Sequence, residues 1–144
     1  MATSSKNSEK KPVLRKPVFT KVESLKPGTQ GHNLVVKVES SEDVLKKGQA
    51  KLLSLRNTRV SECLVGDETA VIIFTARNDQ VDVMKPGTSI IVRNAKIDMF
   101  KGTMRLAVDK WGRIEVTEPV KFEVMKDNNL SLIEYELVTV VGPN

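Results

Sequence analysis

Cationic and aromatic side chains are concentrated in residues 93–113. This interval has a net charge of +4, because it holds six basic residues and two acidic ones: Arg93, Lys96, Lys101, Arg105, Lys110 and Arg113 against Asp98 and Asp109. It also contains Phe100 and Trp111, two of the six aromatic residues in the chain. Sites for unpaired nucleic acid combine these side-chain types, since cations pair with phosphates and aromatic rings stack on bases. The interval therefore predicts a nucleic-acid-binding surface.

The aromatic candidates differ in how strongly their context favours exposure. Phe74 lies in the preceding β-type run, and Phe100 ends the next long run. A phenylalanine on a strand is more often in the core than on the surface, so only the place of these two residues in a barrel favours a binding role. Trp111 lies between Lys110 and Gly112 near a strand end, where the local sequence most favours an exposed ring.

The cationic candidates also have an alternative interpretation, because basic residues that alternate with apolar ones commonly form a solvated strand face. Arg93, Lys96 and Arg105 are preferred as ligand contacts, since their strands flank Phe100. Side chains alternate across a strand. Simple alternation therefore predicts one face with Ile91, Arg93, Ala95 and Ile97, and the other with Val92, Asn94, Lys96 and Asp98. Under this pattern, Arg93 and Lys96 share a face only where a bulge intervenes.

Residue types that support catalysis or metal binding are scarce. His32 and Cys63 are the single histidine and the single cysteine, so an intrachain disulfide and a cysteine-rich zinc site are excluded. Cys63 lies in an alternating strand pattern, which predicts a small buried side chain. The acidic pair Asp67 and Glu68 lies in a predicted turn and is interpreted as solvated. The sequence predicts no enzymatic activity, no cofactor, no metal and no small-molecule substrate.

The candidate residues lie on short β-branched runs separated by turns, a pattern typical of an all-β barrel or sandwich. The runs cover residues 33–39, 58–65, 69–77, 88–100 and 103–109, with a further short run over 113–117. Residues 78–84 are predicted to form a short helix. The tetrapeptide Lys-Pro-Gly-Thr occurs at 26–29 and 85–88, and both copies predict a turn that precedes a strand. Five strands with a helix between the third and fourth predict an OB-fold barrel, whose open face binds oligonucleotides.

Charge divides the chain into three parts. Residues 1–17 are polar and carry a net charge of +4, which predicts a disordered basic tail. Residues 18–120 are predicted to form the OB-fold domain. Residues 121–144 carry a net charge of −2 and are predicted to be a C-terminal extension, which packs as an extra strand or docks on the barrel. Because the whole chain is only +5, residues 18–144 together contribute +1. The basic character of the chain therefore says little about its folded part.

Targeting signals are weak in this sequence. No apolar run approaches the ~20 residues that span a bilayer, so no membrane partner is expected. The N-terminal residues lack the apolar segment of a secretory signal. With a single cysteine, the chain is expected in a reducing compartment, either the nucleus or the cytoplasm.

Between Phe19 and about Pro119, four features follow one another: ECLVGDET, an apolar strand that ends in an aromatic residue, KPGT, and MFKG. In these features the sequence resembles the single OB-fold ssDNA-binding proteins of the SOSS-B type, which are relatives of replication protein A, and especially the plant branch of small OB-fold proteins. The resemblance implies an OB fold and stacking roles for Phe74 and Phe100. Two further aromatic positions of that family hold Lys96 and Ala107 here. Their loss lowers affinity by ~2–6 kcal/mol if base stacking is additive.

The sequence therefore predicts a non-catalytic protein that binds single-stranded nucleic acid, with ssDNA as the first expectation and RNA or G-rich DNA left open. The predicted binding residues are Phe74, Phe100, Trp111, Arg77, Arg93, Lys96, Lys101, Arg105 and Lys110. The alternative is an OB-fold adaptor subunit of a larger protein complex, with weak nucleic-acid contact or contact only through its tail. The near-neutral charge of residues 18–144 and the missing aromatic residues favour this alternative.

Overall fold

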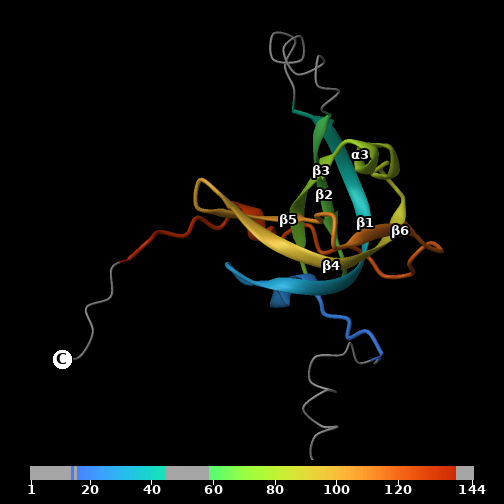
Figure 1. The fold of residues 1–144 in the computed structure, drawn as a ribbon, viewed down its shortest axis with the longest axis horizontal. Helices are drawn as coiled ribbons and strands as arrows, with labels where there is room; N and C mark the ends of the chain where they lie inside the picture. Colours follow the sequence, from blue (N-terminus) through green and yellow to red (C-terminus); the bar gives the residue numbers. More distant parts are fainter. Residues whose placement is uncertain (1–13, 15, 45–58, 139–144) are drawn as a thin grey trace, which may run out of the picture.

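Six strands and three short helical elements make up the part of the chain that the computed structural model describes, which is residue 14 and residues 16–44 and 59–138. In chain order the elements are η1 (Val22–Ser24), β1 (Gln30–Asp43), β2 (Val60–Gly66), β3 (Val71–Arg77), α3 (Asp79–Val83), β4 (Ser89–Phe100), β5 (Thr103–Ala107), β6 (Arg113–Val116) and η2 (Leu130–Leu132). The strands wrap into a barrel, and α3 forms part of the connection from β3 to β4 (Figure 1). Within the described ranges, no helix is long and apolar enough to cross a membrane.

The barrel is closed by β1, which is long enough to pair with two strands. Its first half pairs antiparallel with β4 and its second half with β2, and the remaining order is β2-β3-β5-β4. The β3–β5 pairing is parallel, and β6 adds to β4 as a sixth strand. The predicted five-stranded OB barrel is confirmed, and so is the short helix between β3 and β4. The last residues of β1, 40–43, extend beyond the predicted run of 33–39, and residues 45–58 lie outside the described part.

Alternate residues of the strands fill the barrel interior. On β3, Ile72, Phe74 and Ala76 have no exposed surface, whereas Thr75 is half-buried and Arg77 is exposed. Cys63 is also fully buried, which confirms the prediction of a small core side chain. Other large core residues come from four of the strands and from the residue after α3: Leu34, Val36, Val65, Met84, Ile90, Met104 and Leu106. Burial of a side chain of Phe74's size stabilises the fold by about 1.5–3 kcal/mol.

A bulge in β4 corrects the predicted face assignment of that strand. Asn94 has φ +54°, and the pairing with β1 shifts from Leu34–Val92 to His32–Ala95, so β4 contains one extra residue there. Asparagine is among the few residues that adopt this left-handed conformation readily. The inward series therefore changes phase, and Ala95 joins Val92 in the core. Simple alternation across β4 is wrong, and the bulge puts Arg93 and Lys96 on the same outer face.

The two Lys-Pro-Gly-Thr copies form turns, as predicted. Gly28 has φ +75° and Gly87 has φ +91°, values that favour glycine. In the first copy, the Thr29 hydroxyl donates to the carbonyl of Lys26 at 2.6 Å. In the second copy, the Thr88 N–H donates to the Lys85 carbonyl at 3.0 Å. Each turn ends immediately before its strand, β1 or β4.

Asp67 is buried, which corrects its interpretation as a solvated turn carboxylate. Only 1% of the residue is exposed. One carboxylate oxygen accepts from the backbone N–H of Val22 at 2.9 Å, and the other accepts from the N–H and the hydroxyl of Thr69 at 2.9 and 2.6 Å. A buried carboxylate needs such donors. Asp67 thus fastens η1 to the β2–β3 turn.

The residues after β6 pack along the barrel without forming a continuous strand. The buried Ser131 hydroxyl donates to the Met104 carbonyl at 2.6 Å and accepts from the Ile73 N–H at 2.9 Å, so it bridges β5 and β3. Farther along, the Tyr135 N–H donates to the Gly102 carbonyl at 2.7 Å. This segment therefore reaches the β4–β5 turn, as the red trace in Figure 1 shows.

Candidate nucleic-acid interface

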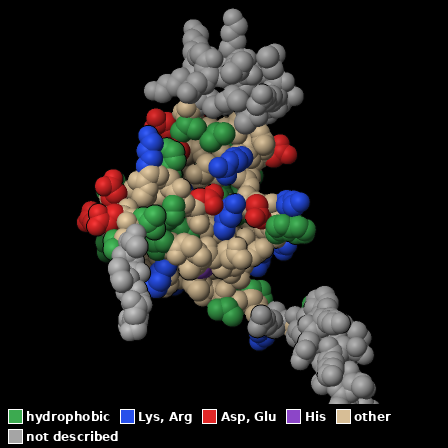
Figure 2. Space-filling view, turned by 60° about the vertical axis from the view of Figure 1, so that its left-hand side comes forward, with side chains coloured by type: hydrophobic (Ala, Val, Ile, Leu, Met, Phe, Trp, Pro, Cys, Tyr) green, Lys and Arg blue, Asp and Glu red, His purple; other side chains and the backbone are tan. Residues whose placement is uncertain are grey.

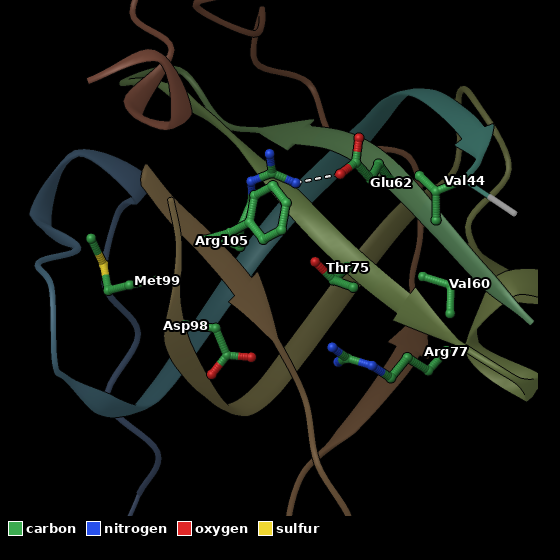
Figure 3. A pocket seen from close by; sticks show the side chains of 9 residues that line it. Val44, Val60, Glu62, Thr75, Arg77, Asp98, Met99 and Arg105 are labelled. Atoms are coloured by element: carbon green, nitrogen blue, oxygen red, sulfur yellow. Dashed lines mark hydrogen bonds and ion pairs between the residues drawn. The ribbon is translucent and has the colours of Figure 1, made fainter. Parts of the chain in front are cut away.

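A groove of about 500 Å³ crosses the outer faces of β2, β3, β5 and β4. We call it the barrel groove. It lies on the side of β2 and β3 where OB folds bind oligonucleotides. Its lining comes from these four strands and from the residue that follows β1: Val44, Val60, Glu62, Thr75, Arg77, Asp98, Met99, Phe100 and Arg105. Figure 3 shows Glu62 and Arg105 at one end of the groove, Thr75 in its middle, and Asp98 and Arg77 on opposite sides toward the other end.

Phe100 offers an exposed aromatic surface beside this groove. The residue is the last of β4 and is 50% exposed, because it lies on the outward side of the strand next to the β4–β5 turn. The Arg105 guanidinium carbon is 4.9 Å from the ring centroid, and Lys101 Nζ is 5.4 Å from it. Cations at such distances are attracted to the ring by its quadrupole. Half of the residue's surface remains open to solvent, and an unpaired base can stack on the ring there.

Charges in the barrel groove are balanced. Arg105 of β5 forms an ion pair with Glu62 of β2, across the intervening β3, and the Asp98 carboxylate lies 3.6 Å from the Lys96 ammonium. Arg105 Nε is buried and has no hydrogen-bond partner in the described part of the chain. Arg105 is therefore committed to Glu62 and Phe100 in the free protein. A phosphate that approaches this end of the groove meets both charges of the pair.

Two cations at the groove have no acidic partner among residues 14, 16–44 and 59–138. Arg77 is exposed at the end of β3, and Lys101 is exposed in the β4–β5 turn. Both Lys101, at φ +50°, and Gly102, at φ +84°, adopt the left-handed conformation that a tight hairpin requires. This turn brings the Lys101 ammonium next to the Phe100 ring. The groove thus has cations available for phosphates on two of its sides.

A second, smaller hollow lies where β4 bulges. We call it the bulge hollow. Its volume is about 240 Å³ and its lining comes from β1, β4 and the β5–β6 turn: Gln30, Gly31, Asn94, Lys96, Asp109 and Trp111. Trp111 is 73% exposed, and Lys110 Nζ lies 5.0 Å from its ring centroid. The Asn94 side-chain amide holds the turn by donating to the Trp111 carbonyl at 3.0 Å.

Lys96 connects the two hollows. It lines the bulge hollow, and its ammonium contacts Asp98 of the barrel groove. The exposed rings of Phe100 and Trp111 therefore border one continuous stretch of the outer face of β4. Figure 2 shows cationic, acidic and apolar side chains interspersed on the side of the molecule that it views. The surface is not one continuous basic area.

Of the predicted binding residues, Phe74 lies in the barrel core and not on the surface. Its side chain has no exposed surface, so the prediction that it offers a stacking face is wrong. The outward polar neighbours Thr75 and Arg77 explain why: alternation turns residue 74 inward. This signal was present in the sequence.

The structure divides the remaining predicted residues among three places. Phe100, Lys101, Arg105 and Arg77 surround the barrel groove, and Trp111, Lys110 and Lys96 surround the bulge hollow. Arg93 lies farther along β4, where its Nε donates to Glu115 at 2.8 Å. Sequence reasoning missed Glu62, although alternation puts it on the same outward face of β2 as Val60. It also missed Phe19, whose ring centroid lies 5.7 Å from the Arg93 guanidinium carbon.

Comparisons with known proteins place these features in a family. Residues 25–116 match a family model described as single-stranded DNA binding protein Ssb-like, OB fold. The Arabidopsis thaliana protein At4g28440 is 61% identical over 136 residues, which cover 90% of this chain and 89% of that protein. The single-stranded DNA binding protein Ssb of Saccharolobus solfataricus is 31% identical over 88 residues, which cover 60% of this chain and 55% of that protein.

Two solved structures are also similar. The solution structure of the Arabidopsis thaliana protein F20O9.120 has a TM-score of 0.73 and 59% identity, and the match covers 92% of this chain and 95% of that one. The OB domain of Ta0387 from Thermoplasma acidophilum has a TM-score of 0.54 and 18% identity, with 74% of this chain and 94% of that one covered. The second likeness concerns the fold alone.

Proposed function

Because this chain belongs to the family of Ssb-like, OB-fold single-stranded DNA-binding proteins, we propose that it binds single-stranded nucleic acid in the barrel groove and catalyses no reaction on it. The observation that carries the proposal is the half-exposed Phe100 ring beside a groove whose Arg77 and Lys101 have no acidic partner in the described residues. Single-stranded DNA is the proposed ligand. RNA and G-rich DNA are alternative outcomes of the same binding experiments.

In this proposal, one base stacks on Phe100 and another on Trp111. Each stacked base contributes about 1–3 kcal/mol without reading the sequence, because every base has a flat π-face. Lys101 and Arg77 pair with phosphates beside the barrel groove, and Lys96 and Lys110 do so beside the bulge hollow. Binding is therefore sequence-tolerant and weakens with salt.

The affinity for single-stranded nucleic acid is expected to be moderate, because stacking residues are few and acidic residues line the groove. Two exposed rings supply stacking, and Phe74 supplies none because it is in the core. Glu62 and Asp98 also place negative charge next to the phosphate path. Acidic groups reduce the gain from neighbouring cations, since like charges repel.

The test is a fluorescence-anisotropy titration of labelled oligo-dT, oligo-U and a G-rich strand with the full chain. Phe100→Ala is expected to weaken binding ~5- to 150-fold, the equivalent of one lost stacked base. Met125→Ala is the control, because Met125 is exposed to a similar degree, at 46%, but lies beside the β2–β3 turn and lines neither hollow. Equal affinity of Phe100→Ala and the unmodified protein would refute the groove as the binding site.

An adaptor role is the second candidate, and the balanced charge of the barrel groove favours it. In that case the barrel docks a protein, and nucleic acid contacts only the basic residues 1–17. A variant that begins at residue 18 separates the two functions. A protein that binds through its barrel keeps most of its affinity for oligo-dT after this truncation, whereas an adaptor loses it.

A further inference from the structure

The N-terminal segment before η1 crosses the outer face of the barrel next to the bulge in β4. The Thr20 N–H donates to the Asn33 carbonyl at 2.9 Å, and the Asn33 side-chain amide donates to the Val18 carbonyl at 3.1 Å. These two bonds hold the backbone on both sides of Phe19 against β1. Phe19 itself is left 44% exposed.

Two asparagine side chains connect this segment to the turn that bears Trp111. The Asn33 side-chain oxygen accepts from the Asn94 N–H at 3.1 Å, and the Asn94 amide donates to the Trp111 carbonyl at 3.0 Å. A chain of hydrogen bonds therefore runs from Val18 through Asn33 and Asn94 to Trp111. It fixes two exposed aromatic residues, 92 positions apart in sequence, on the two sides of one bulge.

A cation accompanies Phe19, as cations accompany Phe100 and Trp111. The Arg93 guanidinium carbon is 5.7 Å from the Phe19 ring centroid. Arg93 and Arg113 are paired across β4 and β6, and both donate to Glu115, at 2.8 and 2.6 Å. The group of two arginines and one glutamate keeps a charge of +1. Arg113 remains two-thirds exposed, with 67% of its side chain accessible.

The three rings follow one path along the outer face of β4. Phe100 lies at the end of the strand, Trp111 lies by Asn94 and Lys96, and Phe19 lies by Arg93. The bulge is what puts Lys96 and Arg93 on the same face. From residue 93 to residue 100 the strand spans roughly 20 Å, at ~3.3 Å per residue. A nucleic acid that follows this path is therefore bound as an extended single strand.

We infer that Phe19 and Arg113 form a third subsite for an unpaired nucleotide, at the far end of the path from Phe100. This inference rests on the proposed function and extends it. In this subsite a base stacks on Phe19, and Arg113 pairs with a neighbouring phosphate while Arg93 stays with Glu115. The binding site is therefore longer than the barrel groove, and it ends where the basic N-terminal residues begin.

The length dependence of binding tests the inference. OB folds bind ~4–16 nucleotides, so oligo-dT of about 5 nucleotides is expected to cover the Phe100 end alone, and oligo-dT of about 15 nucleotides to cover the whole path. Phe19→Ala is expected to weaken binding of the long strand ~5-fold or more and to leave the short strand within twofold. Phe19→Tyr keeps a stacking face and is expected to bind both strands like the unmodified protein.

Phe100→Ala, measured in parallel, separates this inference from the proposed function. Weaker binding of both strands by Phe100→Ala, together with a loss confined to the long strand in Phe19→Ala, supports both. If Phe100→Ala weakens binding but Phe19→Ala leaves the long strand unaffected, the third subsite does not exist and the proposed function stands. If Phe100→Ala changes nothing, the proposed function fails. An equal loss for both lengths in Phe19→Ala overturns the third subsite, because Phe19 would then act through the fold.

Discussion

Glu62→Gln is expected to strengthen nucleic-acid binding and to weaken the fold slightly. The substitution removes the carboxylate that holds Arg105 at the end of the barrel groove and leaves a side chain of the same size. Arg105 is then available for a phosphate, and the phosphate no longer faces a negative charge. Both changes act in the same direction.

The size of the effect follows from the exposure of the pair. The Glu62 side chain is 38% exposed, so a solvent-like dielectric applies to its repulsion of a phosphate. At a separation of roughly 6 Å, that repulsion is ~0.7 kcal/mol, which corresponds to about a threefold gain in affinity. One further neutralised phosphate also steepens the plot of log affinity against log salt by ~0.7. The cost to folding is ~1 kcal/mol, since Arg105 is only 15% exposed and loses its partner.

Two measurements check this prediction. Anisotropy titrations with oligo-dT at several salt concentrations give the affinity and the salt slope, and urea unfolding gives the stability. Glu68→Gln is a matched control, because Glu68 pairs with Lys21 beside the β2–β3 turn and lines neither hollow. Unchanged or weaker binding by Glu62→Gln, with the salt slope of the unmodified protein, would show that nucleic acid does not pass over Arg105.

Three further predictions concern the fold. Phe74→Ala is expected to lower the free energy of unfolding by ~3–5 kcal/mol, which urea unfolding would measure. The affinity of the folded fraction is expected to stay unchanged, which a titration with oligo-dT below the unfolding transition would measure. Asn94→Val is expected to lower the free energy of unfolding by ~1–2 kcal/mol or more, because a β-branched residue disfavours φ +54°. Asn94→Gly keeps the bulge and loses only the side-chain hydrogen bonds. Thermal melts would detect the difference between the two variants. Neighbouring arginines hold the pKa of Asp82 and of Glu115 below the ordinary range. The stability that these carboxylates contribute is therefore present at neutral pH and is lost as the pH falls below about 4. Unfolding curves from pH 7 to pH 3 would show no such loss if the ion pairs are absent in solution.

The fold could be predicted from the sequence, because the strand patterns and turn residues that determine it are local. Each predicted run is found as a strand within a few residues, and both Lys-Pro-Gly-Thr turns lie where their proline and glycine indicate. The inward position of Phe74 was accessible as well, from its polar neighbours Thr75 and Arg77. The place of Phe74 in the barrel and the family resemblance both favoured an exposed ring, whereas the alternation favoured a buried one.

The candidate site was less accessible, because its geometry depends on contacts between distant residues. Glu62 and Arg105 are 43 positions apart, so no local sequence pattern indicates that one neutralises the other. The bulge at Asn94 reverses the faces of β4 through a single backbone angle, and a strand pattern does not reveal it. Phe19 lies outside the basic interval and reaches the outer face of β4 only through the hydrogen bonds of Asn33.

The most direct measurement is an NMR titration of the full ¹⁵N-labelled chain with oligo-dT. If nucleic acid binds in the barrel groove, the largest amide shifts fall on Thr75, Arg77, Phe100 and Lys101, and the amides of the β2–β3 turn around Asp67 do not shift. Shifts confined to residues 1–17, with the barrel groove unaffected, would contradict this prediction.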